Sequence, residues 1–185
     1  MNYYLLFSQF EKDEGSFSVR EPWNLVLDYA DPKIKLLKKK GSYQVDDCYD
    51  ERGMSDCLKI GLGKLASTKI QQVFFDNGFT GIQFVPIEVH NNELYQNYAF
   101  MNVTAHYDLL DPIASEAEDF SDTIGGYTDV YEEIIDKDKL HASNIQHDCF
   151  TLTTYKDPYY VSENVKNALE AAGVTGIEFI PMEFA

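Results

Sequence analysis

The sequence predicts an α+β fold with a mixed β-sheet, built from two related strand–helix–strand units at about residues 56–89 and 148–184. The first observation is a repeat: residues 78–88 read GFTGIQFVPIE and residues 173–183 read GVTGIEFIPME, with seven of eleven positions identical. The second is that strand and helix periodicities interleave along the chain, which is typical of helices packed on a mixed sheet. The 185 residues predict a single domain, 1–185, or two pseudo-repeated lobes that share a core, 1–92 and 93–185.

A strand and a helix are predicted ahead of the first unit. Residues 3–10 form a short apolar run without a preceding basic segment, which predicts a first strand rather than a signal peptide. Residues 32–40 predict a short helix with a basic last turn, which Gly41 stops.

The helix of each unit has a matching start, buried stripe and stop. Ser67 and Ser162 stand at the N-cap positions, where a hydroxyl can accept a backbone N–H. Gly78 and Gly173 follow as left-handed caps. Apolar residues spaced i, i+3 and i+4 predict one buried stripe per helix, formed by Ile70, Val73 and Phe74 and by Val165, Ala168 and Leu169.

The strand that follows each helix carries a proline. Pro86 and Pro181 have no amide hydrogen to donate, so each strand should end or lie at a sheet edge there. The Thr-Gly step before each strand is turn chemistry, which favours a structural role for the repeated phrase. Upstream, Asp56-Cys57 matches Asp148-Cys149 at the start of each unit.

Between the two units, the sequence predicts another strand and another helix. The expected elements are a long strand at 95–107, a turn-rich stretch at 108–126 with a flexible break at Gly125-Gly126, and a helix around 130–135.

The net charge of −16 is concentrated in the second half of the chain. Residues 108–138 hold eleven acidic residues against one lysine, Lys137. Such a field repels nucleic acid and membrane surfaces and attracts basic partners. No stretch approaches the ~20 apolar residues that a membrane span needs. We therefore expect a cytoplasmic protein that binds neither nucleic acid nor membrane.

The sequence contains no recognisable catalytic motif. Residues 61–64 lack the spacing of a phosphate-binding loop, the four histidines lack metalloprotease spacing, and no Gly-x-Ser-x-Gly elbow occurs. The three cysteines have no CxxC spacing, and the two in the repeated strand, Cys57 and Cys149, are predicted to be buried free thiols. We expect no catalytic residue, no metal and no cofactor; a small enzyme with a dispersed active site is the less favoured alternative.

The acidic segment also carries aromatic side chains, which predicts an interface. Aromatic residues bring large buried areas to interfaces, and carboxylates around them select a basic partner. A solvated acidic face is the ordinary alternative. The residues expected to contact a partner are Asp108, Asp111, Glu116, Glu118, Asp119, Phe120, Asp122, Tyr127, Asp129, Tyr131, Glu132 and Glu133.

Three features together suggest a family. Residues 98–103 read YAFMNV and precede Asp108, Asp111 and Ser115; a helix leads into the strand at 81–87; and the C-terminal echo lies at 176–181. Over about residues 56–184 the chain resembles a bacterial immunity-protein family, once a domain of unknown function. Asn102, Asp108 and Asp111 match its pattern, and we expect them to be structural first.

The resemblance implies a stoichiometric inhibitor rather than an enzyme. Members of such families bind and block a cognate polymorphic toxin in the producing cell, in type VI or contact-dependent interbacterial competition. The partner implied here is a toxin with a basic active-site face. An acidic adaptor or nucleic-acid mimic outside toxin systems is the alternative, and the oligomeric state is left open.

Overall fold

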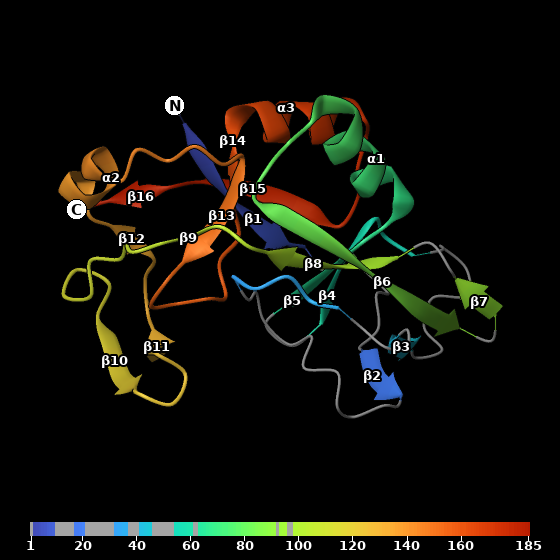
Figure 1. Cartoon of the computed structure of the whole chain (residues 1–185), viewed down its shortest axis with the longest axis horizontal. Helices are drawn as coiled ribbons and strands as arrows, with labels where there is room; N and C mark the ends of the chain where they lie inside the picture. Colours follow the sequence, from blue (N-terminus) through green and yellow to red (C-terminus); the bar gives the residue numbers. More distant parts are fainter. Residues whose placement is uncertain are drawn as a thin grey trace.

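Helices and strands are mixed throughout the chain, as Figure 1 shows. The computed structural model describes residues 2–9, 17–20, 32–36, 41–45, 54–60, 63–91, 93–95 and 98–185. Its sheets combine antiparallel and parallel pairs, which confirms the predicted α+β class.

The larger sheet is built mainly from the first half of the chain. Its strands are β2 (Phe17–Arg20), β3 (Gly41–Val45), β4 (Cys57–Ile60), β5 (Gly63–Ala66), β6 (Ile82–Asn91), β7 (Glu93–Tyr95) and β8 (Ala99–Val103). They lie in the order β2-β3-β6-β8-β5-β4, with β7 paired to β6. β3 runs parallel to β6, and the other pairs are antiparallel.

The second sheet joins the two ends of the chain. Its strands are β1 (Tyr3–Ser8), β9 (His106–Tyr107), β13 (Cys149–Leu152), β14 (Tyr160–Ser162) and β15 (Ile177–Pro181). They lie in the order β15-β1-β14-β13-β9. The N-terminal strand is therefore an interior strand of the sheet that the C-terminal unit builds.

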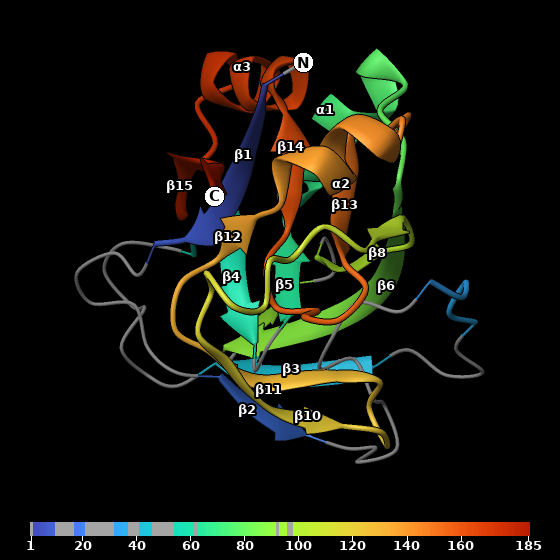
Figure 2. The same ribbon diagram turned by 90° about the vertical axis from the view of Figure 1, so that its left-hand side faces the viewer.

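Two short strand pairs and the helices complete the described fold. The pairs are β10 (Ala117–Ser121) with β11 (Gly126–Val130), and β12 (Ile134–Ile135) with β16 (Glu183–Phe184). The helices are α1 (Thr68–Asn77), α2 (Lys137–Ala142) and α3 (Glu163–Ala171). The β10–β11 hairpin extends away from α1 and α3 (Figures 1 and 2).

The repeated units have equivalent strand orders, β4-β5-β8-β6 in the first and β13-β14-β1-β15 in the second. β8 opposes β6 with Ala99 facing Pro86, and β1 opposes β15 with Tyr4 facing Pro181. β1 thus occupies in the second unit the place that β8 occupies in the first. Each unit has an antiparallel strand pair before its helix, one strand more than the sequence predicted.

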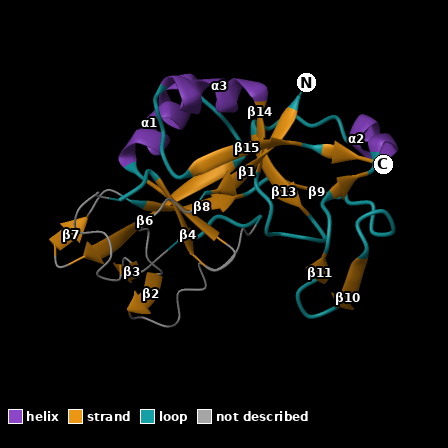
Figure 3. Ribbon diagram, turned by 180° about the vertical axis from the view of Figure 1, so that it is seen from behind, coloured by secondary structure: helices purple, strands orange, loops and turns teal. Residues whose placement is uncertain are grey.

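The helices of the two units lie side by side and share a core (Figures 1 and 3). Ile70 and Phe74 of α1 are buried in the same cluster as Val165 and Leu169 of α3, which confirms the two predicted stripes. The predicted glycine caps are also confirmed, because both glycines have φ of 64°.

The two predicted serine caps have different outcomes. Ser162 Oγ accepts the amide of Val165 at 3.4 Å, as expected of an N-cap. Ser67 makes no such bond, because its hydroxyl donates instead to Asp56 Oδ1 at 2.7 Å. Both serines therefore stand at N-cap positions, as predicted, but only Ser162 caps its helix through its side chain.

Reciprocal contacts hold each unit on the other, and we call them the cross-unit contacts. The amide and hydroxyl of Thr80 each donate to Asp148 Oδ2 at 3.0 Å, and the amide of Cys149 donates to the Thr80 carbonyl at 3.0 Å. Thr175 donates to Asp56 Oδ2 in the same way, at 3.0 and 3.1 Å. The repeated Thr-Gly phrase is therefore structural, as predicted.

The first proline does not end its strand. β6 continues beyond Pro86 to Asn91 in the interior of the larger sheet, so the prediction is wrong there. The amide of Ile87 donates to the carbonyl of Tyr98, just before β8, so the nitrogen of Pro86 faces the other side. There β3 pairs with β6 only from Ile87 onward. The prediction is right for Pro181, which ends β15 at the edge of its sheet.

Three other expectations also need correction. The stretch at 95–107 is not one strand, because β8 and β9 are separate. The expected helix around 130–135 is the end of β11, a turn and β12, and the helix begins only at Lys137. Residues 32–36 are not helical, and residues 37–40 lie outside the described residues.

Candidate partner-binding surface

The β10–β11 hairpin carries the central part of the acidic segment. Its turn is closed by Gly125, which has φ of 64° and whose amide donates to the Ser121 carbonyl at 2.8 Å. Gly126 lies against the backbone of Thr154 with no room for a side chain, and the amide of Tyr127 donates to the Thr154 carbonyl at 2.8 Å. The glycine pair therefore closes and anchors the hairpin, and the predicted flexible break is wrong.

The hairpin exposes apolar groups among carboxylates. Phe120 is 52 % exposed and packs edge-on against Tyr127, with ring centroids 5.1 Å apart, and Ile124 at the tip is 47 % exposed. Residues 116–133 contain seven acidic residues and neither lysine nor arginine. None of the ion pairs formed within the described part of the chain involves these seven carboxylates.

Two acidic residues of this region hold a strained backbone. Glu116 has φ of 47° and Asp119 has φ of 52°, in the region that side chains other than glycine seldom adopt. Such conformations cost of order 1–3 kcal/mol each and persist where the surrounding structure enforces them, often in binding segments. Here the Asp119 carbonyl accepts the Thr128 hydroxyl at 3.3 Å across the hairpin.

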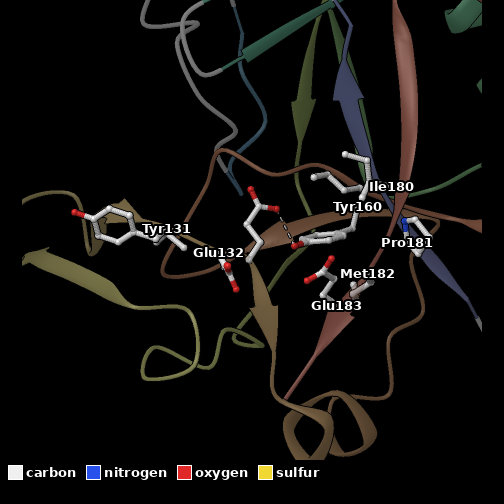
Figure 4. A pocket seen from close by; sticks show the side chains of 10 residues that line it. Tyr131, Glu132, Tyr160, Ile180, Pro181, Met182 and Glu183 are labelled. Carbon is white, nitrogen blue, oxygen red and sulfur yellow. Dashed lines mark hydrogen bonds between the residues drawn. The ribbon is translucent and has the colours of Figure 1, made fainter.

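A pocket of about 320 Å³ lies at the base of the hairpin, and we call it the basal pocket (Figure 4). It is formed where β1, β14, the end of β15 and the link between β11 and β12 meet. Its lining residues are Leu5, Val130, Tyr131, Glu132, Glu133, Tyr160, Ile180, Pro181, Met182 and Glu183.

Glu133 is a partly buried carboxylate of the basal pocket whose pKa is raised. Burial raises the pKa of Glu133 and the Asp157 carboxylate raises it further, while the Tyr160 hydroxyl and the Lys64 ammonium offset part of this effect. The Tyr160 hydroxyl donates to Glu133 Oε2 at 3.1 Å, the bond drawn in Figure 4. The Tyr160 ring is itself held in place by stacking on Phe150 at 5.4 Å.

The predicted contact residues do not form one patch. Glu116, Glu118, Asp119, Phe120, Asp122, Tyr127 and Asp129 belong to the hairpin or its entry, and Tyr131, Glu132 and Glu133 line the basal pocket. Asp108 lies by α2, where it pairs with Lys139 at 3.3 Å. Asp111 Oδ1 accepts the amides of Ile113 and Ala114 at 3.0 Å each and so shapes a turn.

The described residues show no arrangement for metal or thiol chemistry. Among them, no group of three or more His, Cys, Asp or Glu side chains could hold a metal ion. Cys57 and Cys149 are buried free thiols, and burial raises the pKa of Cys149 to about 12. Cys48 lies outside the described residues.

With this geometry in place, the comparisons identify the family. The sequence model of the Imm11 immunity protein family matches residues 22–183. The chain belongs to the Imm11 immunity protein family. No curated protein matches it. The match begins well before residue 56, where the sequence resemblance was expected to start.

Membership gives the Imm11 chain its general role, immunity against a toxin. The family-pattern residue Asn102 is fully buried, and its side-chain amide donates to the Lys33 carbonyl at 3.1 Å, which confirms a structural role. No helix among the residues described is long and apolar enough to cross a membrane.

Sequence reasoning missed most of the basal pocket of this Imm11 protein. Leu5 and Tyr160 come from strands that are distant in sequence, and nothing in their local pattern marks them, whereas Ile180 lies in the repeated phrase. Pro181, Met182 and Glu183 belong to the repeated phrase, which was interpreted as structural only.

Proposed function

We propose that this immunity protein binds its cognate toxin domain through an acidic surface formed by the β10–β11 hairpin and the adjoining residues 131–133. The toxin would present a basic active-site face, and binding would block it stoichiometrically, without catalysis, in the cytoplasm of the producing cell. The observation that carries the proposal is the hairpin itself, which exposes Phe120 and Ile124 among carboxylates that no described cation neutralises.

Two properties of the hairpin support this assignment. Unpaired carboxylates on a projecting element steer a basic partner and raise its association rate, by about 10–10³-fold in favourable cases. Exposed aromatic and aliphatic side chains then supply the desolvated contacts that carry most binding energy. Acidic residues alone would supply only the first property.

The hairpin is also held in place before binding. Its second strand is bonded to Thr154, and the Lys156 ammonium donates to the Ile124 carbonyl near the tip at 3.0 Å. A pre-organised element loses less conformational entropy on association than a free loop would. The buried free thiols of Cys57 and Cys149 support a reducing compartment such as the cytoplasm.

Co-expression with the neighbouring gene product tests the proposal. We expect that product to be toxic alone, and we expect this chain to restore growth and to co-purify with it at a 1:1 ratio. The association rate with the toxin should fall tenfold or more in a variant that has lysine in place of Glu118, Asp119, Asp122 and Asp129. Added salt, which slows association of the wild-type protein, should no longer slow that of the variant.

The matched control carries the same change of charge elsewhere. This control variant has lysine in place of four exposed acidic residues outside the hairpin and basal pocket: Asp76, Glu163, Glu170 and Glu178. Its association rate should stay within about threefold of the wild-type rate. Equal slowing by both variants would show that net charge alone matters, and unchanged binding by the hairpin variant would refute the hairpin as the interface.

A further inference from the structure

The basal pocket differs in kind from the acidic face above it, because it is concave and has apolar walls. Leu5, Ile180 and Met182 supply aliphatic and thioether surface, and Tyr131, which is 69 % exposed, is also among the lining residues. A volume of about 320 Å³ lies near the lower end for small-ligand sites, which suits a single inserted side chain.

The carboxylates of the basal pocket lie at two depths. Glu132 and Glu183 are exposed at its rim, whereas Glu133 is half-buried and held by the Tyr160 hydroxyl. Neither lysine nor arginine is among the lining residues. The pocket therefore presents acceptors along its depth and no cation of its own.

Lys64, a buried cation that lines a cavity next to the basal pocket, forms no ion pair with Glu133. A cavity of about 60 Å³ shares Leu5 and Glu133 with the basal pocket and contains the Lys64 side chain. The Lys64 ammonium lies over the Tyr159 ring, 4.5 Å from its centroid, and forms no ion pair within 4.0 Å in the described part of the chain. Burial lowers the pKa of Lys64.

The inner cavity has other polar groups besides Lys64 and Glu133. It is lined by Lys59 and Asp157 and by Ser8, whose buried hydroxyl has no hydrogen-bond partner among the described residues. Asp157 adds negative charge beside Glu133, and the Ser8 oxygen is free to accept a donor. A guanidinium that reaches Glu133 from the basal pocket would bring N–H donors that carboxylate and hydroxyl oxygens can accept.

We propose that the basal pocket is a socket for one arginine side chain of the toxin, with its guanidinium on Glu133 and its aliphatic stem along Leu5, Ile180 and Met182. This inference rests on the proposed toxin-binding function. Arginine fits better than lysine because its planar fork can bond several carboxylate oxygens at once and can stack on aromatic rings such as Tyr131. An acidic or neutral partner group would leave Glu133 uncompensated.

Methionine-methyl NMR of the whole protein tests the socket without the toxin. The chain has four methionines, and among them Met182 lines the basal pocket while Met101 is fully buried in the core as an internal reference. The probe is N-acetyl-arginine amide, and its neutral isostere N-acetyl-citrulline amide is the control. We expect a saturable shift of Met182 with the arginine compound, none at Met101, and none with the citrulline compound.

Variants locate the recognition. Glu133→Gln removes the charge, keeps the shape and leaves an oxygen for the Tyr160 hydroxyl, so we expect about tenfold weaker binding or more from the lost charge-assisted bond. Glu163→Gln at the exposed start of α3 carries the same change of charge and should bind as wild type does. An unchanged Met101 signal in each variant shows that the fold is intact.

The outcomes separate the socket from the proposed function. If the toxin binds but the arginine compound leaves Met182 unshifted, or if Glu133→Gln and wild type bind it equally, the socket is refuted and the immunity role stands. If the arginine compound binds through Glu133 but the neighbouring gene product neither binds nor harms cells, the socket stands and its assignment to a toxin is overturned.

Discussion

Replacing Gly81 by alanine should destabilise this protein much more than the same change at Gly78, three residues earlier. Both glycines have positive φ, 91° at Gly81 and 64° at Gly78. A Cβ at Gly78 would meet nothing within 4 Å, whereas a Cβ at Gly81 would overlap the backbone carbonyl of Cys149 in the other unit. The comparison therefore separates backbone strain from loss of the cross-unit contacts.

The magnitudes follow from these two surroundings. A left-handed alanine costs roughly 1–2 kcal/mol, which is the whole effect expected at Gly78. At Gly81 the overlap with backbone adds about 1–3 kcal/mol, since the carbonyl cannot rotate away as a flexible side chain can. Displacing that carbonyl also loosens the 3.0 Å bond from the Cys149 amide to Thr80, so we expect about 3–5 kcal/mol in total.

Urea unfolding of both variants measures the difference, and the second unit supplies an independent pair. Gly176 lies against the backbone of Cys57 as Gly81 lies against Cys149, and Gly173 is open as Gly78 is. Gly176→Ala should therefore lower the free energy of unfolding more than Gly173→Ala does. Equal losses at the open and the occluded glycines, in either unit, would show that the cross-unit contacts do not hold the units together.

Three further outcomes are expected. The pKa of Glu133 is higher in the folded protein than in the unfolded chain, where it is ~4.3. The Glu133 carboxyl therefore stabilises the folded state at pH values below ~4.3, and this stabilisation is lost as the pH rises through the pKa of the folded protein. Glu133→Gln should accordingly be more stable than wild type by about 0.5–2 kcal/mol at pH 7 and about equally stable at pH 4, as measured by thermal unfolding. If the variant were less stable at pH 7, the burial of an uncompensated charge at Glu133 would be contradicted. Burial alone would raise the pKa of Asp56, but hydrogen bonds from Lys69, Ser67 and the Thr175 backbone lower it on balance. The Asp56 carboxylate therefore stabilises the folded state above its unfolded pKa of ~3.9, and this stabilisation is lost as the pH falls through the lower pKa of the folded protein. Asp56→Asn should thus flatten the acid limb of stability against pH, and an unaltered limb would argue against these bonds. Cys149, with a pKa of about 12, should resist iodoacetamide at pH 8 in native protein and react once urea unfolds it, as peptide mass spectrometry can show; rapid native alkylation would contradict its burial.

Local sequence was sufficient where neighbours along the chain decide the structure. The stripes of α1 and α3, their glycine stops and the strands that follow were predictable, because caps and periodicity act over a few residues. Prediction failed around residues 130–135, where Val130 and Ile134 have helical spacing but Ile134 and Ile135 pair with β16 near the C-terminus. A pairing across so many residues leaves no trace in the local pattern.

The candidate site divides in the same way. The acidic and aromatic content of the hairpin was visible in the sequence, although its form was not. The basal pocket was not visible, because its walls come from β1, β14 and β15 and become neighbours only when the N-terminal strand enters the second sheet.

The sequence by itself determined the duplication, the α+β class, the negative charge of residues 108–138 and the resemblance that the Imm11 match confirms. Only the tertiary structure decided that the units bind each other through Thr80 and Thr175, and that Glu133 is desolvated with a raised pKa. The physical reason is that composition and short-range periodicity are properties of the chain. Burial and strand partnership depend on which distant segments meet.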